Sequence, residues 1–353
     1  MTEKISANLG KINKTIISLG AEMQSVFCIY NSGNLLISKN FGDTSNLDNF
    51  NLYKKELEDY INKNNLKPDI ILADMHPIYN TSLYAEELSK KSGAALIKVQ
   101  HHLAHAYSVA VEHNLTTFSS IICDGLGYGT DGTIWGGEIF HQNQRIGHLE
   151  QHKQLGGDSA TQHPAKMLIS ILSKFQDEKE ILENLRGYFT QHQLKILLKQ
   201  LNQNYNCPLT TSCGRILDAA SFLLGFATER TYDGSPAIEL DKNASIPYEI
   251  TQVIENDILK TVPLFQYLIE NKTKDKKRLA ATVISYIAEG LYKIASKPKL
   301  PIVFSGGCAH SKLFSGILAN KGIFLNKEIS CGDAGISFGQ LACYLTNSRN
   351  NVA

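Results

Sequence analysis

The sequence predicts an α/β protein with mostly parallel sheets, because short apolar segments alternate with segments of helical periodicity. Residues 68–74 have the composition of a buried strand and lie between two segments with helical spacing, 47–62 and 82–91. The alternation returns near the C-terminus, where a strand-like segment at 301–308 precedes a helical one at 311–320. A chain of 353 residues is long enough for two domains, or for one large domain with two cores.

The N-terminal region predicts a strand, a glycine turn and a hairpin. The apolar segment 15–22 contains Gly20, and a second apolar run at 25–30 leads into the turn-forming sequence Asn-Ser-Gly-Asn at 31–34. Residues 35–38 then predict a third strand. This order is typical of the start of a ribonuclease-H-like sheet.

A second copy of that pattern begins at Ser119. Residues 119–124 predict a strand that ends on Asp124, and the glycines that follow predict a turn at 125–129. Two further strands are expected at 133–140 and 144–150. Two ribonuclease-H-like halves would explain both copies.

We therefore expect two lobes. The first lobe is predicted to comprise 1–115 and 335–353, and the second 116–334. The second lobe is expected to carry a helical insertion at about 156–261, in which 164–175, 181–200 and 212–226 have helical spacing.

Composition argues against a nucleic-acid-binding, a membrane-spanning or a secreted, disulfide-rich protein. Hydrophobic residues make up 43% and charged residues 20% of the chain, the formal net charge is +1, and no Lys/Arg run indicates a nucleic-acid footprint. No apolar run reaches the roughly 18 residues of a membrane span, and no signal peptide is visible. The seven cysteines are scattered without a C-x-x-C pair, which favours reduced thiols in a cytoplasmic protein.

Three histidines fall within five residues, between a predicted strand at 94–99 and a predicted helix at 104–112. His101 and His105 are four positions apart, so on a helix they share one face and could bind one metal ion. The alternative is a surface or hydrogen-bonded pair, which is the commoner role of such spacing. His102 points off the shared face, and we expect it to pack or hydrogen-bond locally.

Two aspartates could complete such a site. Asp124 ends a predicted strand, and Asp333 precedes a helix, where the alternative role of its carboxylate is to cap backbone N–H groups. Two imidazoles with two carboxylates would suit a catalytic Fe(II) or Zn(II) ion.

Several glycine turns could bind phosphate. Gly306 and Gly307 follow an apolar strand, and 156–158 and 232–236 combine glycine with an acidic residue. Taken singly, the turns at 156–158 and 232–236 are better explained as ordinary loop turns, but all the turns together suggest a nucleotide site. The chain has no G-x-x-x-x-G-K-[ST] sequence, which argues against Walker-type ATP hydrolysis.

Seven segments resemble one known family, the C-terminal carbamoyltransferase domain of the hydrogenase maturation protein HypF. A more distant similarity links the chain to the TsaD family of tRNA modification proteins and to antibiotic O-carbamoyltransferases. The segments are 99–105, 123–138, 156–158 with Pro164, 212–219, 237–240, 305–307 and 333–340.

The resemblance implies a two-lobed, actin-like ATPase fold with a divalent metal (Fe or Zn) and a nucleotide, ATP or carbamoyl-adenylate. By matching position, the metal ligands and catalytic residues would be His101, His105, Asp124 and Asp333. The nucleotide-binding residues would be Gly156, Gly157, Asp158, Gly214, Asp218, Gly234, Glu239, Gly306 and Gly307.

The resemblance also implies an activity and partners. Members of the family transfer a carbamoyl group from carbamoyl-adenylate to the C-terminal cysteine of a partner such as HypE. The acylphosphatase, zinc-finger and adenylate-forming domains of full-length HypF have no counterpart in this sequence. We therefore expect a separate adenylate-forming protein to make the donor.

Three positions depart from the family pattern. Gln24 stands where the first phosphate turn usually has a lysine, and His310 and Ser311 stand where a Gln-Asn pair is usual. A lost lysine removes charge that would stabilise a phosphate. Two alternatives remain: a catalytically degenerate, nucleotide-binding relative with a regulatory or partner-binding role, and a TsaD-like tRNA modification subunit.

Overall fold

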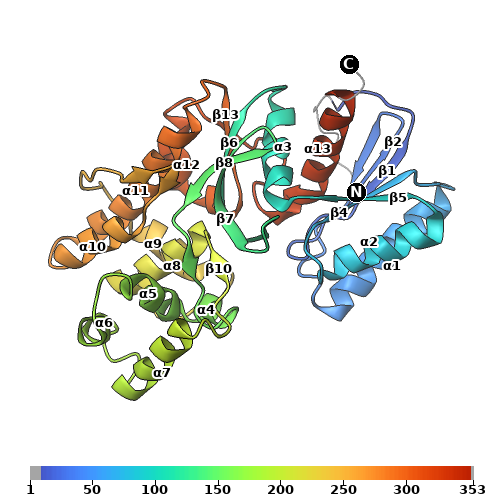
Figure 1. The fold of residues 1–353 in the computed structure, drawn as a ribbon. Helices are drawn as coiled ribbons and strands as arrows, with labels where there is room; N and C mark the ends of the chain where they lie inside the picture. Colours follow the sequence, from blue (N-terminus) through green and yellow to red (C-terminus); the bar gives the residue numbers. More distant parts are fainter. Residues whose placement is uncertain (1–8, 351–353) are drawn as a thin grey trace. The chain divides into compact units, whose positions relative to one another are not determined.

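The structure, a computed structural model, describes residues 9–350. Its first sheet has the strand order β3-β2-β1-β4-β5 (Figure 1). The first three strands pair antiparallel, and β4 and β5 continue the sheet parallel to β1. The strands are β1 Thr15–Ser18, β2 Cys28–Asn31, β3 Asn34–Ile37, β4 Ile70–Asp74 and β5 Ala95–Val99.

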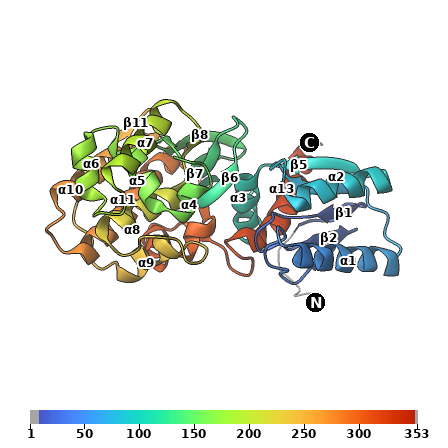
Figure 2. The same ribbon diagram turned by 90° about the horizontal axis from the view of Figure 1, so that it is seen from below.

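Both faces of this sheet are covered. Ile17 and Leu19 pack in a core with side chains of α1 (Leu47–Lys63) and α2 (Asn80–Ser92). Ser18 alternates with them along β1, and its hydroxyl donates to Gln340 Oε1 of α13 (Ile336–Asn350) at 2.7 Å. Because side chains alternate between faces along a strand, α13 covers the face opposite α1 and α2. Figure 2 shows these elements from below.

The second sheet has the path β11-β12-β8-β7-β6-β13-β14. Strands β8-β7-β6-β13-β14 repeat the order of the first sheet, which confirms the duplication that the sequence predicts. The strands are β6 Ser119–Tyr128, β7 Ile134–His141, β8 Gln144–Leu149, β11 Ile254–Glu255, β12 Ile258–Leu259, β13 Ile302–Ser305 and β14 Phe324–Leu325, with β9 His152–Lys153 and β10 Leu209–Thr210 beside them.

The region between β8 and β13 is mainly helical, as expected. Its helices are α4 Ser159–Gln162, α5 Pro164–Leu172, α6 Glu178–Asn184, α7 Gln191–Asn202, α8 Cys213–Leu224, α9 Ser235–Asn243, α10 Val262–Glu270 and α11 Lys276–Ala295. After β13 come the 3₁₀ turn η1 Gly307–His310 and helix α12 Lys312–Ala319.

The structure corrects two sequence-based boundaries. The expected helical segment 181–200 is divided between α6 and α7, because Gly187 has a φ of 75° and Thr190 starts α7 with a capping box. The predicted turn at 125–129 is mostly strand, since β6 continues to Tyr128. The chain reverses after it, where the Asp131 carboxylate accepts the N–H of Thr133.

Two compact units divide the described residues. One comprises the described parts of Met1–Ile122, Leu300–Gly307 and Ile323–Ala353, and the other comprises Cys123–Lys299 and Cys308–Gly322. The lobe boundaries expected from the sequence stay a prediction. No helix in residues 9–350 is both long enough and apolar enough to cross a membrane.

Candidate metal centre

A single residue, Gln100, separates the end of β5 from the start of α3 (His101–Glu112), and it caps the helix. The Gln100 side-chain carbonyl accepts the N–H of Leu103 at 3.0 Å. The helix therefore starts at His101, three residues before the expected start at 104. His101 and His105 lie one turn apart, and both are buried.

A carboxylate lies behind the first histidine. Asp74 is the last residue of β4, the strand next to β5, and its Oδ2 lies 2.7 Å from His101 Nδ1. Both side chains are fully buried. The contact leaves the other ring nitrogen, Nε2, as the atom of His101 directed to Asp333.

The second carboxylate comes from the C-terminal part of the chain. Asp333 opens the 3₁₀ turn η2 (Asp333–Gly335), and its side chain is 20% exposed. Its Oδ1 lies 3.7 Å from His101 Nε2 and 3.8 Å from His105 Nε2. Nε2 of both histidines therefore faces the same oxygen, Oδ1 of Asp333.

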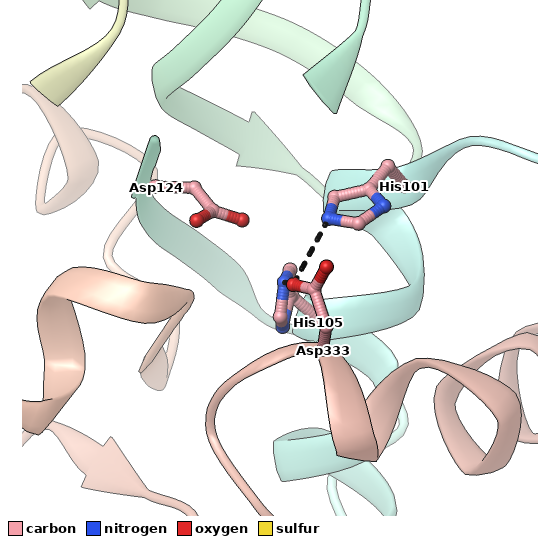
Figure 3. Close-up of side chains that lie close together, drawn as sticks. All are labelled: His101, His105, Asp124 and Asp333. Atoms are coloured by element: carbon pink, nitrogen blue, oxygen red, sulfur yellow. Dashed lines mark ion pairs between the residues drawn. The ribbon is translucent and has the colours of Figure 1, made fainter. Parts of the chain in front are cut away.

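The third carboxylate is on β6. Asp124 is 7% exposed, and its Oδ1 accepts the N–H of Gly125 at 2.7 Å. It follows Ile122 by two residues, and Ile122 pairs with Ser305 of β13, so the strand itself holds it in place. Figure 3 shows it close to His101, His105 and Asp333, and one ligand atom from each of the four lies within 4.8 Å of the others.

These four side chains fit a divalent transition metal. An ion about 2.0–2.2 Å from each of its nitrogen and oxygen ligands separates them by about 3–4.4 Å. The His–Asp333 separations of 3.7 and 3.8 Å fall in that range, and the widest separation in the group needs only a small contraction. Two imidazoles and two carboxylates would offset the charge of a divalent ion, and the set suits Fe(II) or Zn(II).

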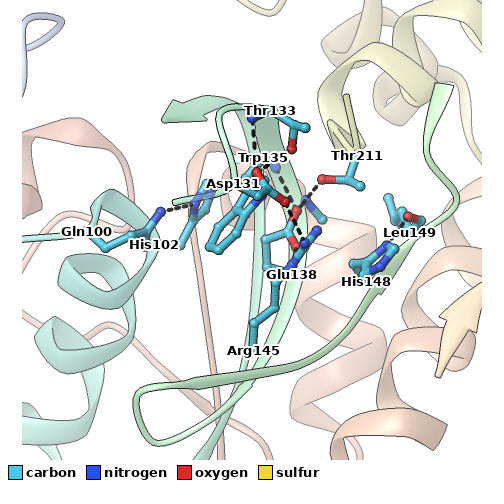
Figure 4. Close-up of polar contacts among 12 residues, drawn as sticks. Gln100, His102, Asp131, Thr133, Trp135, Glu138, Arg145, His148, Leu149 and Thr211 are labelled. Carbon is cyan, nitrogen blue, oxygen red and sulfur yellow. Dashed lines mark hydrogen bonds and ion pairs between the residues drawn. The ribbon is translucent and has the colours of Figure 1, made fainter. Parts of the chain in front are cut away.

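His102 is outside this group, as expected. Its Nδ1 lies 3.2 Å from Gln100 Nε2, and its side chain is buried (Figure 4). The hydrogen bond is local, between the cap residue of α3 and the first turn of that helix.

Sequence reasoning gave no role to Glu138, which lies fully buried on β7. Its Oε1 accepts the N–H groups of Gly136 and Gly137 and the hydroxyl of Thr211, and its Oε2 accepts Arg145 Nε at 2.6 Å (Figure 4). Arg145 also lies 4.2 Å from the Trp135 ring centroid. A buried charge requires such partners, so the network fixes the conformation of β7.

The predicted nucleotide residues occupy several turns. Gly156 and Gly157 both have positive φ, at 82° and 57°, and Asp158 precedes α4 without a side-chain capping bond. Lys166 supplies a cation there: its Nζ donates to Ser159 Oγ at 2.8 Å. Beside it lies a cavity of about 360 Å³, lined by His163, Lys166, Tyr188, Phe189, Gln193 and Glu229.

The predicted nucleotide residues on α8, Gly214 and Asp218, have packing roles in the structure. A Cβ on Gly214 would lie 3.1 Å from Gly125 Cα, so Gly214 allows α8 to approach β6. Asp218 is fully buried, which raises the pKa of its carboxyl, although nearby Arg215 opposes the shift. Asp218 Oδ1 also accepts the N–H of Ala237 on α9. Nucleotide contact by these residues stays a prediction.

Two more predicted residues lie at or on α9: Gly234 immediately before it and Glu239 within it. Gly234 precedes the helix with a φ of 70°, in the left-handed region. Glu239 is partly exposed and forms an ion pair with Lys242 at 2.8 Å.

The predicted double glycine follows β13. Gly306 has a φ of 102°, and its N–H donates to the Cys331 carbonyl, while Gly307 begins η1. Of the three departures, Gln24 has a φ of 47° and His310 ends η1. Ser311 caps α12 and donates to Asp241 Oδ1 at 2.5 Å, so this substitution has a structural use.

The two similar sheets and the histidine–aspartate group define a duplicated α/β protein with a candidate metal centre whose residues come from α3, β6 and η2. Two matches to protein-family models identify the family within this class of proteins. Residues 120–340 match "Carbamoyltransferase, Kae1-like Domain, second subdomain", and residues 11–112 match "HypF Kae1-like domain". The chain belongs to the HypF carbamoyltransferase family.

Individual relatives agree. The chain is 38% identical to "Probable carbamoyltransferase HypF" of Methanocaldococcus jannaschii, over 97% of this chain and 48% of that protein. It is 27% identical to "Carbamoyltransferase HypF homolog" of Cupriavidus necator, over 94% of this chain and 91% of that protein.

Solved structures show the same fold. T. kodakarensis HypF superimposes with a TM-score of 0.89 at 26% identity, over 96% of this chain and 48% of that chain. Full-length HypF in a phosphate- and nucleotide-bound form gives a TM-score of 0.87 at 26% identity, over 95% and 56%. The chain thus spans about half the length of the M. jannaschii and T. kodakarensis proteins.

Proposed function

We propose that this protein is a carbamoyltransferase of the HypF type, which transfers a carbamoyl group from carbamoyl-adenylate to a cysteine thiol. The observation that carries the proposal is the group formed by His101, His105, Asp124 and Asp333, in a chain of the HypF family. Two of its relatives by sequence are named as carbamoyltransferases.

The four residues would hold the metal, with His101 and His105 binding through Nε2 and the aspartates through carboxylate oxygens. When bound there, a divalent ion supplies Lewis-acid polarisation of the carbamoyl carbonyl. The residues themselves would fix the position of the ion and, since three of the four are buried, would limit the access of water.

The glycine turns at 156–158 and 306–307, with Lys166, are proposed to bind the adenylate. Backbone N–H groups of glycine turns and a nearby ammonium group stabilise phosphate charge.

The reaction needs two partner proteins, one that supplies the carbamoyl donor and one that accepts the carbamoyl group. The donor would come from an adenylate-forming protein, and the acceptor would be the C-terminal cysteine of a protein such as HypE. In the transfer, the sulfur–carbon bond forms, the carbon–oxygen bond to AMP breaks, and the thiol proton leaves with solvent. The products are an S-carbamoyl cysteine and AMP.

The test combines purified protein with carbamoyl phosphate, ATP, an adenylate-forming HypF domain and an acceptor with a C-terminal cysteine. We expect the intact mass of the acceptor to rise by one carbamoyl group. Asp333→Asn should abolish this gain, because it removes the carboxylate that faces both histidines. Asp59→Asn, which changes an exposed residue on α1, is the matched control.

If the wild-type protein carbamoylates no acceptor while it still binds nucleotide, the proposal is wrong. The chain is then better explained as a catalytically degenerate nucleotide-binding protein. Gln24 is the residue that favours that second candidate. Modification of a tRNA in place of a protein thiol would favour the TsaD-like candidate.

A further inference from the structure

Asp74 contacts a residue of the metal group, His101, without belonging to that group. Its side chain is fully buried at the end of β4. Oδ2 lies 2.7 Å from His101 Nδ1, and Oδ1 accepts the N–H of His76 at 2.9 Å. Both carboxylate oxygens are therefore engaged, each by a different nitrogen.

We propose that Asp74 is a positioning residue that fixes the tautomer and ring orientation of His101 for metal binding. This inference deepens the proposed function and rests on it. A carboxylate oxygen only accepts, so His101 Nδ1 carries the hydrogen and donates it to Asp74. The lone pair then lies on Nε2, the atom that is 3.7 Å from Asp333 Oδ1.

The geometry of the strand supports this assignment. β4 pairs in parallel with β5 and brings Asp74 opposite Val99, two residues before His101. The backbone of Asp74 is also fixed by α2, because Ser82 Oγ on that helix donates to the Asp74 carbonyl oxygen at 3.2 Å. The carboxylate thus belongs to the rigid sheet and can hold the imidazole at a constant angle.

Asparagine at this position has the same shape but cannot make both contacts. Its amide has one acceptor oxygen, whereas His76 N–H and His101 Nδ1–H are both donors. If the oxygen stays with His76, the NH₂ group faces His101 and favours the opposite tautomer, with hydrogen on Nε2. That tautomer removes the lone pair that binds the metal.

The first experiment measures Zn²⁺ affinity of the full chain by competition with a chromophoric chelator. We expect Asp74→Asn to weaken binding by about 10–100-fold. Asp69→Asn is the matched control, because Asp69 precedes the same strand and its carboxylate accepts only the N–H of Thr15 in the contacts described. This control should retain wild-type affinity.

The second experiment needs no variant, and so it does not depend on whether Asp74→Asn folds. Long-range ¹H–¹⁵N correlation spectra of ¹⁵N-histidine-labelled wild-type protein, with and without Zn²⁺, report the tautomer of each imidazole. His101 should be protonated at Nδ1 in both spectra and should show a zinc shift at Nε2.

The outcomes separate this inference from the proposed function. Suppose that the wild-type protein binds Zn²⁺. If Asp74→Asn then binds Zn²⁺ with the same affinity, or if His101 of the wild type is protonated at Nε2, the role of Asp74 is overturned and the proposed function stands. Absence of Zn²⁺ and Fe²⁺ binding in the wild type overturns the proposed metal chemistry. The metal-free spectrum would then still decide whether Asp74 holds the Nδ1–H tautomer.

Discussion

At the scale of single residues, charge determines what the candidate metal centre can bind. Asp74, Asp124 and Asp333 surround two histidines, and four of these five side chains, all but that of Asp333, are buried. Carboxylates gathered at such a density repel one another unless a cation lies among them. This balance of charge favours a bound metal over a purely structural hydrogen-bond cluster.

The double substitution His101→Ala with His105→Ala tests the ligands directly. We expect metal content to fall from about one equivalent per chain to background, because two of the four ligands are lost. Elemental analysis of protein purified in parallel measures it. His141→Ala, at an exposed histidine on β7, serves as control. Equal metal content in the double variant and the wild type would contradict the site.

At the scale of elements, the position of α3 depends on α13. Gly339 on α13 packs directly on the backbone of α3, where a Cβ would lie only 1.9 Å from the Ala104 carbonyl oxygen. Gln340 anchors α13 to the first sheet, because its Oε1 accepts from Ser18 Oγ and from the N–H of Gly20. The helix that carries both histidines is thus held by a helix more than 200 residues further along the chain.

Gly339→Ala should destabilise the protein by about 1–3 kcal/mol, because α3 and α13 must separate to admit the methyl group. Gly316→Ala on α12 is a matched control, since a Cβ there meets no atom within 4 Å. Alanine favours the helix there, and we expect a gain of up to about 1 kcal/mol.

Urea denaturation, with zinc affinity measured alongside, compares these two variants. Zinc affinity should fall only in Gly339→Ala, because α3 carries the histidines. Equal stability of the two glycine variants would show that α3 and α13 are not in close contact.

At the scale of the whole molecule, a buried histidine makes stability depend on pH. His152 lies in the second unit, with Nε2 2.6 Å from Thr261 Oγ1. Burial, reinforced by the charge of Lys174, holds the pKa of His152 well below its usual range. Near it, Glu150 accepts the N–H groups of Thr261 and Val262 and so caps α10.

The direction in which stability changes with pH follows from the difference in proton uptake between the folded and unfolded states. Below about pH 6.5 the unfolded chain protonates this histidine while the folded protein keeps it neutral, so stability falls as the pH falls. In His152→Gln, the free energy of unfolding should depend on pH less steeply by up to about 1.4 kcal/mol per pH unit between pH 6 and 4.5. Urea denaturation at several pH values measures it. Parallel pH profiles for the variant and the wild type would refute the assignment.

Local patterns in the sequence determined much of this protein. The alternation of strands and helices and the duplicated hairpins follow from hydrophobic periodicity and turn residues, which act over a few neighbouring positions. The four-residue spacing of His101 and His105 likewise placed both on one face of a helix. For Asp333, sequence position left capping as an alternative, and the family resemblance selected both Asp124 and Asp333 as ligands.

Only the tertiary structure decided which distant residues meet. Asp74 was visible in the sequence as an acid at a strand end, but its contact with His101 depends on the parallel pairing of β4 and β5. Glu138 acquires its role only when Thr211 and Arg145 reach it. Local periodicity fixes the direction of a side chain along its own element, whereas its partners depend on how separate elements pack.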